Sequence, residues 1–152
     1  MNNTFEAVLN RAVVSLNLKA ADMHGAIIEL VAALAARGQI LPQQVEPVTQ
    51  AVLKREMSAS TVMADGIALP HGRLDTISQL ICAIGISAGF NGNASDGKPV
   101  RIILLLLVPT QVGCNHIHFL ARISQKLLDP ITHEKLVTAT APEEVLKTLL
   151  PA

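Results

Sequence analysis

His71 is the residue of this chain whose type and setting are best suited to covalent chemistry. It lies in segment 65–73, which reads DGIALPHGR. Neutral imidazole is abundant near neutral pH and is nucleophilic at nitrogen. Pro70 restrains the backbone before it, and Gly72 leaves space for a bulky partner after it. An ordinary loop histidine has the same local sequence, so the residues alone leave both interpretations open.

A second group of reactive side chains lies in segment 114–118, which reads CNHIH. Successive residues of a helix are about 100 degrees apart, so His116 and His118 point to different sides. His116 shares its side with Leu120 and Ile123, at the border of an apolar stripe, and His118 faces solvent. We therefore expect His116 to look toward a site at the edge of a sheet. Two surface histidines remain the alternative.

A metal centre is the other chemistry that these residues permit. Cys114 and His118 are four residues apart and share a helix face, but zinc sites need three or four ligands. The remaining histidines, at positions 24, 71 and 133, have spacings that do not complete such a set. The chain also lacks a glycine-rich nucleotide-binding signature and a Gly-x-Ser-x-Gly elbow. We expect neither a metal nor a cofactor.

Composition restricts the class of protein. Half of the 152 residues are apolar, 16% are charged, and twelve basic residues balance twelve acidic ones. With three Phe and no Trp or Tyr, base stacking on nucleic acid is not expected. The N-terminus does not resemble a signal peptide, and the apolar run 102–108 is far shorter than the roughly 20 residues of a membrane helix. These features predict one cytoplasmic domain over residues 1–152, without membrane insertion and with Cys82 and Cys114 as free thiols.

Helical periodicity marks several segments. Residues 21–36 form the clearest pattern, with Asp22 as the expected cap and Gly38 just after the end. A second helix is expected from Pro42 to about Glu56, and a third over 115–128. Two short helices are expected near 132–140 and 142–149. The apolar stripe expected for the third helix comprises Ile117, Leu120, Ala121, Leu127 and Leu128.

Three segments have strand character. Segment 61–69 is expected to be a strand that Pro70 ends, which places His71 in the loop that follows. Segments 80–87 and 100–108 are apolar, and the second suits a central strand buried on both faces. We therefore expect an α/β fold in a single domain, with a mixed sheet of about five strands and helices on both of its faces.

Several motifs, taken together, resemble the mannitol/fructose-type enzyme IIA domains of the bacterial phosphoenolpyruvate-dependent sugar phosphotransferase system, a family that includes the nitrogen-regulatory IIA proteins. The resemblance covers essentially the whole chain in the right order. The matching segments are Arg55-Glu56, Ser60-Thr61, 66–73 (GIALPHGR), 96–100 (DGKPV), 107–109 (LVP) and 116–120 (HIHFL).

The resemblance implies a role for each site residue. His71 would accept a phosphoryl group from the histidine-containing carrier protein HPr and pass it to a cysteine or histidine of a IIB partner for sugar uptake. His116 would be the second active-site histidine. It and the Thr61 hydroxyl would donate to the phosphoryl oxygens, and Arg55 would supply positive charge or hold the loop. A regulatory IIA protein that binds target proteins according to its phosphorylation state, or a binding module of the same fold that is not phosphorylated, are the alternatives.

One segment departs from the family pattern. The family commonly has Thr-Gly-Ile-Gly-Asn-Gly before the conserved histidine motif, whereas segment 61–66 here reads TVMADG. Two glycines are lost, and Asp65 introduces a carboxylate in place of an amide. If Asp65 lies close to His71, it will repel a phosphoryl group, which would affect partner choice and transfer rate.

Overall fold

The computed structural model describes residues 3–111 and 115–151, and its central element is the strand β5 (Val100–Pro109). Side chains alternate between the two faces of a strand. On β5 both sets are buried, because Ile103, Leu105 and Leu107 pack in one hydrophobic core and Ile102, Leu104, Leu106 and Val108 pack in a second. The run of apolar residues is thus explained by a strand covered on both sides, as the sequence predicted.

The sheet has five strands and is mixed. β4 (Ile81–Phe90) pairs antiparallel with β5 on one side, and β1 (Val13–Leu18) pairs parallel with β4 at the outer edge. On its other side β5 pairs in parallel with two short strands in succession, β2 (Ile67–Ala68) and β3 (His71–Leu74).

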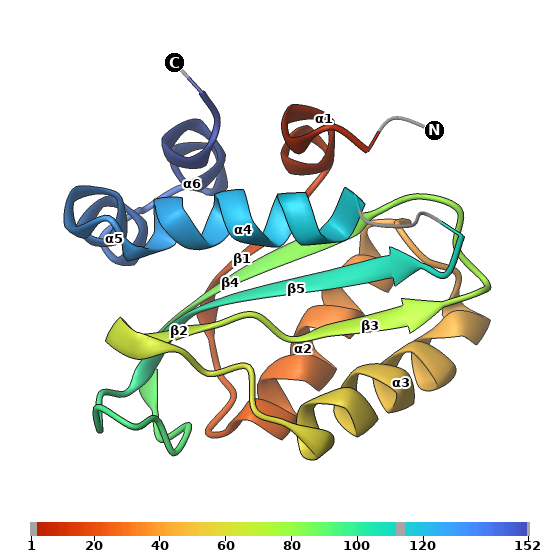
Figure 1. Cartoon of the computed structure of the whole chain (residues 1–152), viewed down its shortest axis with the longest axis horizontal. Helices are drawn as coiled ribbons and strands as arrows, with labels where there is room; N and C mark the ends of the chain where they lie inside the picture. The colour runs from red at the N-terminus through yellow and green to blue at the C-terminus, as the bar shows by residue number, and fades with distance from the viewer. Residues whose placement is uncertain (1–2, 112–114, 152) are drawn as a thin grey trace.

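Helices cover both faces of this sheet (Figure 1). α2 (Met23–Ala36) and α3 (Val45–Ser58), the latter preceded by a short 3-10 turn (Pro42–Gln44), pack in the first core. α1 (Phe5–Asn10), α4 (Asn115–Leu128), α5 (Pro130–Val137) and α6 (Pro142–Leu149) pack in the second. The predicted α/β fold is confirmed. Within the described residues, no helix is both long enough and apolar enough to cross a membrane.

The expected helix boundaries follow from local capping. The Asp22 side chain accepts a hydrogen bond from the Gly25 backbone N–H at 2.7 Å and so begins α2. Asp129 ends α4 and caps α5 by accepting from the Thr132 N–H at 3.0 Å. The short helix α1 and the edge strand β1 are elements that the sequence analysis did not identify.

The strand expected over 61–69 was wrong for most of its length. Asp65 and Gly66 have φ values of 63° and 75°, a left-handed backbone that cannot continue a strand. They form a 3-10 turn (Ala64–Gly66). Backbone hydrogen bonds close the loop around this turn, and in one of them the Met63 N–H donates to the Ile67 carbonyl at 2.7 Å. Only β2 remains extended and paired with β5.

Two further expectations were wrong. His71 is not in a loop after a strand, because it is the first residue of β3 and pairs with Leu106. The buried stripe of α4 consists of Phe119, Ile123 and Leu127, whereas Ile117 and Leu128 are exposed. The helix is rotated from the expected orientation because the two aromatic residues Phe5 and Phe119 meet beneath it, with ring centroids 5.4 Å apart.

Candidate functional site

His71 is positioned by its own backbone and by β5. Pro70 and His71 sit beside Leu106, whose N–H donates to the Pro70 carbonyl at 3.0 Å. Nδ1 of the His71 ring lies 3.0 Å from the carbonyl oxygen of Leu69. A carbonyl can only accept, so Nδ1 donates and carries the proton, and in the neutral ring Nε2 has the lone pair. The half-buried imidazole therefore presents Nε2 as its nucleophilic atom.

α3 forms one wall of the site. Gly72 allows close contact, because a Cβ at this position would come within 3.0 Å of Cγ2 of Val52 on α3. Ala51, Arg55 and Ser58 recur at i, i+4 and i+7 on one side of this helix, which is the spacing of a single helical face. Nη1 of Arg55 donates to the Ala59 carbonyl at 2.7 Å, which holds its guanidinium against the C-terminal end of the helix.

The first turn of α4 forms the opposite wall through His116 and Ile117. α1 fixes the orientation of this helix. The guanidinium of Arg122 lies 4.2 Å from the ring centroid of Phe5, and its Nη1 lies 3.4 Å from a carboxylate oxygen of Glu6. Together with the contact between Phe5 and Phe119, these interactions tie the N-terminal helix to the helix that carries His116.

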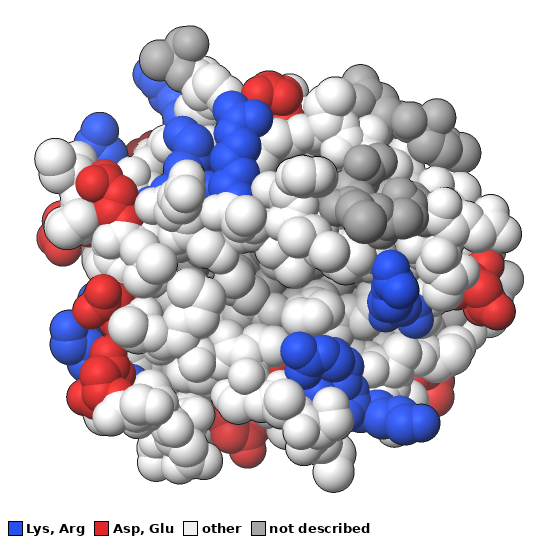
Figure 2. Space-filling view, in the orientation of Figure 1, with Lys and Arg blue, Asp and Glu red and all other residues white. Residues whose placement is uncertain are grey.

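These walls enclose an open pocket of about 930 Å³ beside β3. Its lining comprises Ala51, Lys54, Arg55, Ser58, His71, Gly72, Arg73, Thr110, His116 and Ile117. Figure 2 shows separate basic patches over α3 and the end of β3, with uncharged surface between them. Among the described residues no group of three or more His, Cys, Asp or Glu side chains is placed to hold a metal ion.

The pocket brings together three of the four site residues that the sequence analysis named, His71, His116 and Arg55. The exposed His118 is not part of the lining, and Cys114 lies outside the described residues. The fourth residue, Thr61, is not in this lining and is hydrogen-bonded to Glu56. Its hydroxyl donates to Oε1 at 2.6 Å and its N–H donates to Oε2 at 2.9 Å. Thr61 can donate to a phosphoryl oxygen only after its hydroxyl leaves that carboxylate.

Sequence analysis missed Lys54, Ser58, Arg73 and Thr110 in this lining. Arg73 lies two residues after His71, which places both side chains on the same face of a strand. This spacing predicts a shared site only if His71 is known to be in a strand. Lys54 lies three residues after Ala51, and Ser58 lies three residues after Arg55. Residues at this spacing share a helical face, so the helical period could have predicted Lys54 and Ser58.

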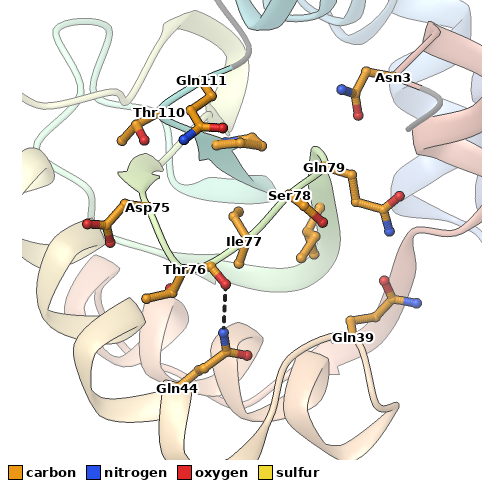
Figure 3. A pocket seen from close by; sticks show the side chains of 12 residues that line it. Asn3, Gln39, Gln44, Asp75, Thr76, Ile77, Ser78, Gln79, Thr110 and Gln111 are labelled. Carbon is orange, nitrogen blue, oxygen red and sulfur yellow. Dashed lines mark hydrogen bonds between the residues drawn. The ribbon is translucent and has the colours of Figure 1, made fainter.

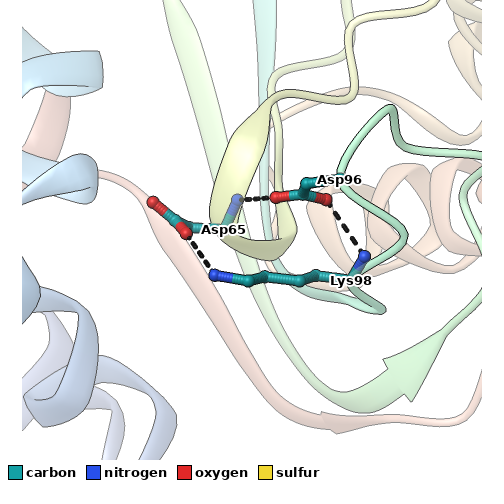
Figure 4. Close-up of polar contacts among 3 residues, drawn as sticks. All are labelled: Asp65, Asp96 and Lys98. Atoms are coloured by element: carbon teal, nitrogen blue, oxygen red, sulfur yellow. Dashed lines mark hydrogen bonds and ion pairs between the residues drawn. The ribbon is translucent and has the colours of Figure 1, made fainter.

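Asp65 lies away from this pocket, in a polar cluster between two loops (Figure 4). Its Oδ1 forms an ion pair with Nζ of Lys98 at 2.8 Å, and its N–H donates to Oδ2 of Asp96 at 2.9 Å. Backbone hydrogen bonds from Asp65 and Lys98 hold the pKa of Asp96 below its usual value, and the hydrogen bond and charge of Asp65 raise the pKa of Lys98.

The register of β5 separates Asp65 from His71. The partner of His71, Leu106, is four residues beyond Ile102, the partner of Ile67. At 3.3 Å per residue this is about 13 Å, and Asp65 lies before Ile67 in the chain. The loop 61–66 therefore carries the negative charge of Asp65 at the opposite end of the β2–β3 segment from His71. The charge of Lys98 compensates it there.

A second open pocket, of about 790 Å³, adjoins the first and shares Thr110 with it (Figure 3). Carboxamide and hydroxyl side chains dominate its lining, which among the described residues contains one carboxylate, Asp75, and no Lys or Arg. Gln44 braces one wall, since its Nε2 donates to the Thr76 carbonyl at 3.1 Å. Of these two adjoining pockets, only the one that contains His71 has Lys or Arg side chains in its described lining.

Comparison with known proteins places this chain among phosphotransferase components. A nitrogen regulatory protein of Escherichia coli is 33% identical over 124 residues, which cover 80% of this chain and 75% of that protein. A fructose-specific EIIA component of Haloferax volcanii is 34% identical over 100 residues, 65% of each chain.

Solved structures of the same kind of protein have a similar fold. The crystal structure of the nitrogen regulatory protein IIA-Ntr from Neisseria meningitidis superimposes with a TM-score of 0.81 at 26% identity and covers 95% of this chain and 98% of that one. The crystal structure of IIA mannitol from Escherichia coli shares the fold, with a TM-score of 0.75 at 24% identity over 99% of this chain and all of that one. The family description "Phosphoenolpyruvate-dependent sugar phosphotransferase system, EIIA 2" matches residues 7–151, and this chain belongs to that family.

Proposed function

We propose that this protein carries a phosphoryl group on Nε2 of His71, accepting it from an HPr-like phosphocarrier protein and passing it to a IIB component. The observation that carries the proposal is the hydrogen bond from Nδ1 of His71 to the Leu69 carbonyl inside a basic pocket. It leaves the nucleophilic nitrogen free toward the pocket and fixes the plane of the ring.

The transfer step needs few protein groups. The Nε2 lone pair attacks phosphorus in line, the P–N bond of the donor phosphohistidine breaks, and its electron pair returns to the donor imidazole. Onward transfer reverses these roles, because a cysteine thiolate or imidazole of the acceptor attacks phosphorus and the P–Nε2 bond breaks. His71 needs no general base, since its reacting nitrogen already lacks a proton.

The phosphorylated imidazole carries a negative charge that the lining residues stabilise. His116 lines the pocket from α4 and in this proposal donates to a phosphoryl oxygen, while Arg55 contributes positive charge from α3. Arg55 is tethered through Nη1 to the Ala59 carbonyl, and in this proposal it acts through its charge rather than as a bidentate clamp. Moderate stabilisation suits a carrier, because a tightly held phosphoryl group would not leave.

Regulation by phosphorylation state is the second candidate function. The relatives that are about a third identical to this chain over the aligned residues include nitrogen regulatory proteins, as well as the fructose-specific component. In this version the same chemistry at His71 sets the affinity for target proteins. A solved complex of IIA mannitol with phosphorylated IIB mannitol has this fold at 24% identity, which illustrates transfer to a IIB partner in that system.

Reconstitution tests the carrier function. The protein is incubated with phosphoenolpyruvate, enzyme I and HPr, and its intact mass is measured. We expect one phosphoryl group on the wild type and none on His71→Ala, with His118→Ala as the matched control that is modified normally. A folded wild type that stays unmodified beside an active donor chain would favour the unphosphorylated binding module.

A further inference from the structure

Asn91 begins the loop that joins β4 to β5, and its exposed side-chain amide stands next to Gly92. Oδ1 of Asn91 accepts a hydrogen bond from the Asn93 N–H at 2.9 Å. This bond draws electron density from the amide carbon Cγ. It also lies where negative charge would collect if a nucleophile added to that carbon. The local geometry therefore favours attack on Cγ of Asn91.

The backbone nitrogen of Gly92 is the nucleophile that can reach this carbon within the chain. Its attack closes a five-membered ring, and glycine has no Cβ to obstruct the closure. Among the described residues, no hydrogen bond is formed by the Gly92 N–H or by Nδ2 of Asn91, so both groups are free to react. Packing also demands a glycine here, because an added Cβ would overlap Cγ2 of Val100. The fold thus retains a reactive pair, Asn91-Gly92.

A matched segment of the same loop lacks this reactivity. Asp96 also precedes a glycine, Gly97, and its Oδ1 accepts from the Lys98 N–H at 3.0 Å (Figure 4). Its side chain is a carboxylate, however, and backbone hydrogen bonds from Asp65 and Lys98 hold its pKa below the usual value. It therefore stays ionised near neutral pH and is a poor electrophile. The Gly97 N–H is also engaged, since it donates to the Ala94 carbonyl at 3.1 Å.

We propose that Asn91 is a site of self-modification in the folded protein, which converts it to aspartate and isoaspartate through a cyclic imide. The Gly92 nitrogen loses its proton to a base and bonds to Cγ. The Cγ–Nδ2 bond then breaks, and the amine takes up a proton and leaves as ammonia. Water adds to either carbonyl of the ring and reopens it. The product carboxylate stands at a cavity of about 330 Å³ whose lining also includes His24 and the carboxylates of Asp22 and Glu56.

Incubation of the purified protein at mildly alkaline pH tests this site, because base removes the Gly92 proton. Samples are taken over time in native buffer and at several urea concentrations. Peptide mass spectrometry locates each exchange of an amide NH₂ for OH, and a protein isoaspartate methyltransferase quantifies the isoaspartate. Asn91→Gln is the matched variant, since its longer side chain would have to close a less favoured six-membered ring.

In native buffer we expect Asn91 to be converted at least about tenfold faster than Asn93, which an alanine follows. Asp96 should not isomerise, and the Asn91→Gln protein should gain no isoaspartate in this loop. The rate at Asn91 should not follow the unfolded fraction in urea, because the folded loop presents the reacting groups. The proposal is overturned if Asn91 keeps its amide in the native protein, if it reacts only in proportion to the unfolded fraction, or if Asn93 or Asp96 reacts equally fast.

Discussion

At the scale of single residues, one backbone carbonyl decides which ring nitrogen of His71 keeps a free lone pair in the neutral imidazole. The Leu69 oxygen lies two residues before the histidine and accepts from Nδ1, so the local chain alone sets the tautomer. Because Pro70 stands between them with a restricted φ, this arrangement is stiff before any partner arrives. The imidazole is thus oriented by its own strand, and the surrounding helices supply the charge and shape of the pocket.

His116 is expected to contribute to the transfer step. Replacing it with alanine removes a donor to the phosphoryl oxygens, and we expect His116→Ala to slow phosphoryl transfer from His71 to a IIB acceptor by about 10²-fold. Rapid-quench kinetics with the phosphorylated protein measures this rate. His118→Ala is the control, because His118 is exposed and does not line the pocket. Normal onward transfer by His116→Ala would contradict the role.

Gly66 is required by the turn that leads into the site. Its φ of 75° is left-handed, and an added Cβ would overlap the carbonyl oxygen of Pro99. We expect Gly66→Ala to lower the free energy of unfolding by more than about 3 kcal/mol, as measured by urea denaturation. Gly38→Ala is the matched control, since Gly38 has the same φ but open space around it, and should cost about 1 kcal/mol. Equal losses would show that the overlap is relieved.

Residue type revealed part of this site. The phosphoryl-accepting role expected for His71 came from the resemblance to the family, whereas helical geometry predicted that His116, and not His118, looks toward the site. Arg73 was not found, because its relation to His71 depends on a four-residue strand that pairs only with β5. The separation of Asp65 from His71 likewise depends on register in the sheet, which is a property of the folded chain.

At the scale of elements, the N-terminal helix acts on the site through α4. Phe5 packs against Phe119 and beneath Arg122, so these side chains join α1 to α4. We expect Phe5→Ala, which removes a side chain 7% exposed, to lower the free energy of unfolding by about 3 kcal/mol in urea denaturation. Ile131→Ala, at a position 68% exposed, should change it by less than about 0.5 kcal/mol. Similar small changes in both variants would show that α1 is not clamped.

Elements could be predicted where local signals and burial agree. α2 has both a side-chain cap and a buried face, and β5 is apolar throughout because both faces are covered. Segment 61–69 has the residue types of a strand, yet Asp65 and Gly66 turn left-handed and Gly66 approaches Pro99. That approach is a long-range contact, so local propensity could not reveal it.

At the scale of the whole molecule, one sheet separates two hydrophobic cores, and both must open for the protein to unfold. Cys82 lies on β4 in the second core and is 1% exposed. Burial raises the pKa of its thiol strongly, and the nearby charge of Arg11 offsets this only in part. Little reactive thiolate is therefore present in the native protein.

This burial predicts that Cys82 reports global unfolding. In a Cys114→Ser background, we expect iodoacetamide to leave Cys82 unmodified under native conditions and to label it at a rate that follows the unfolded fraction in urea. Mass spectrometry quantifies the label. Ile131→Cys in the same background supplies an exposed thiol that reacts at once. Rapid native labelling of Cys82 would show that the second core opens locally.

The proposed carrier function requires phosphorylation at one nitrogen of one residue, Nε2 of His71. The most direct measurement is nitrogen–phosphorus coupling by NMR on protein with ¹⁵N-labelled histidine, phosphorylated through phosphoenolpyruvate, enzyme I and HPr. We predict a single phosphohistidine, His71, with the coupling at Nε2 and the Nδ1 proton retained on the Leu69 carbonyl. Coupling at Nδ1, a phosphoryl group on another residue, or no phosphohistidine beside an active donor would contradict it.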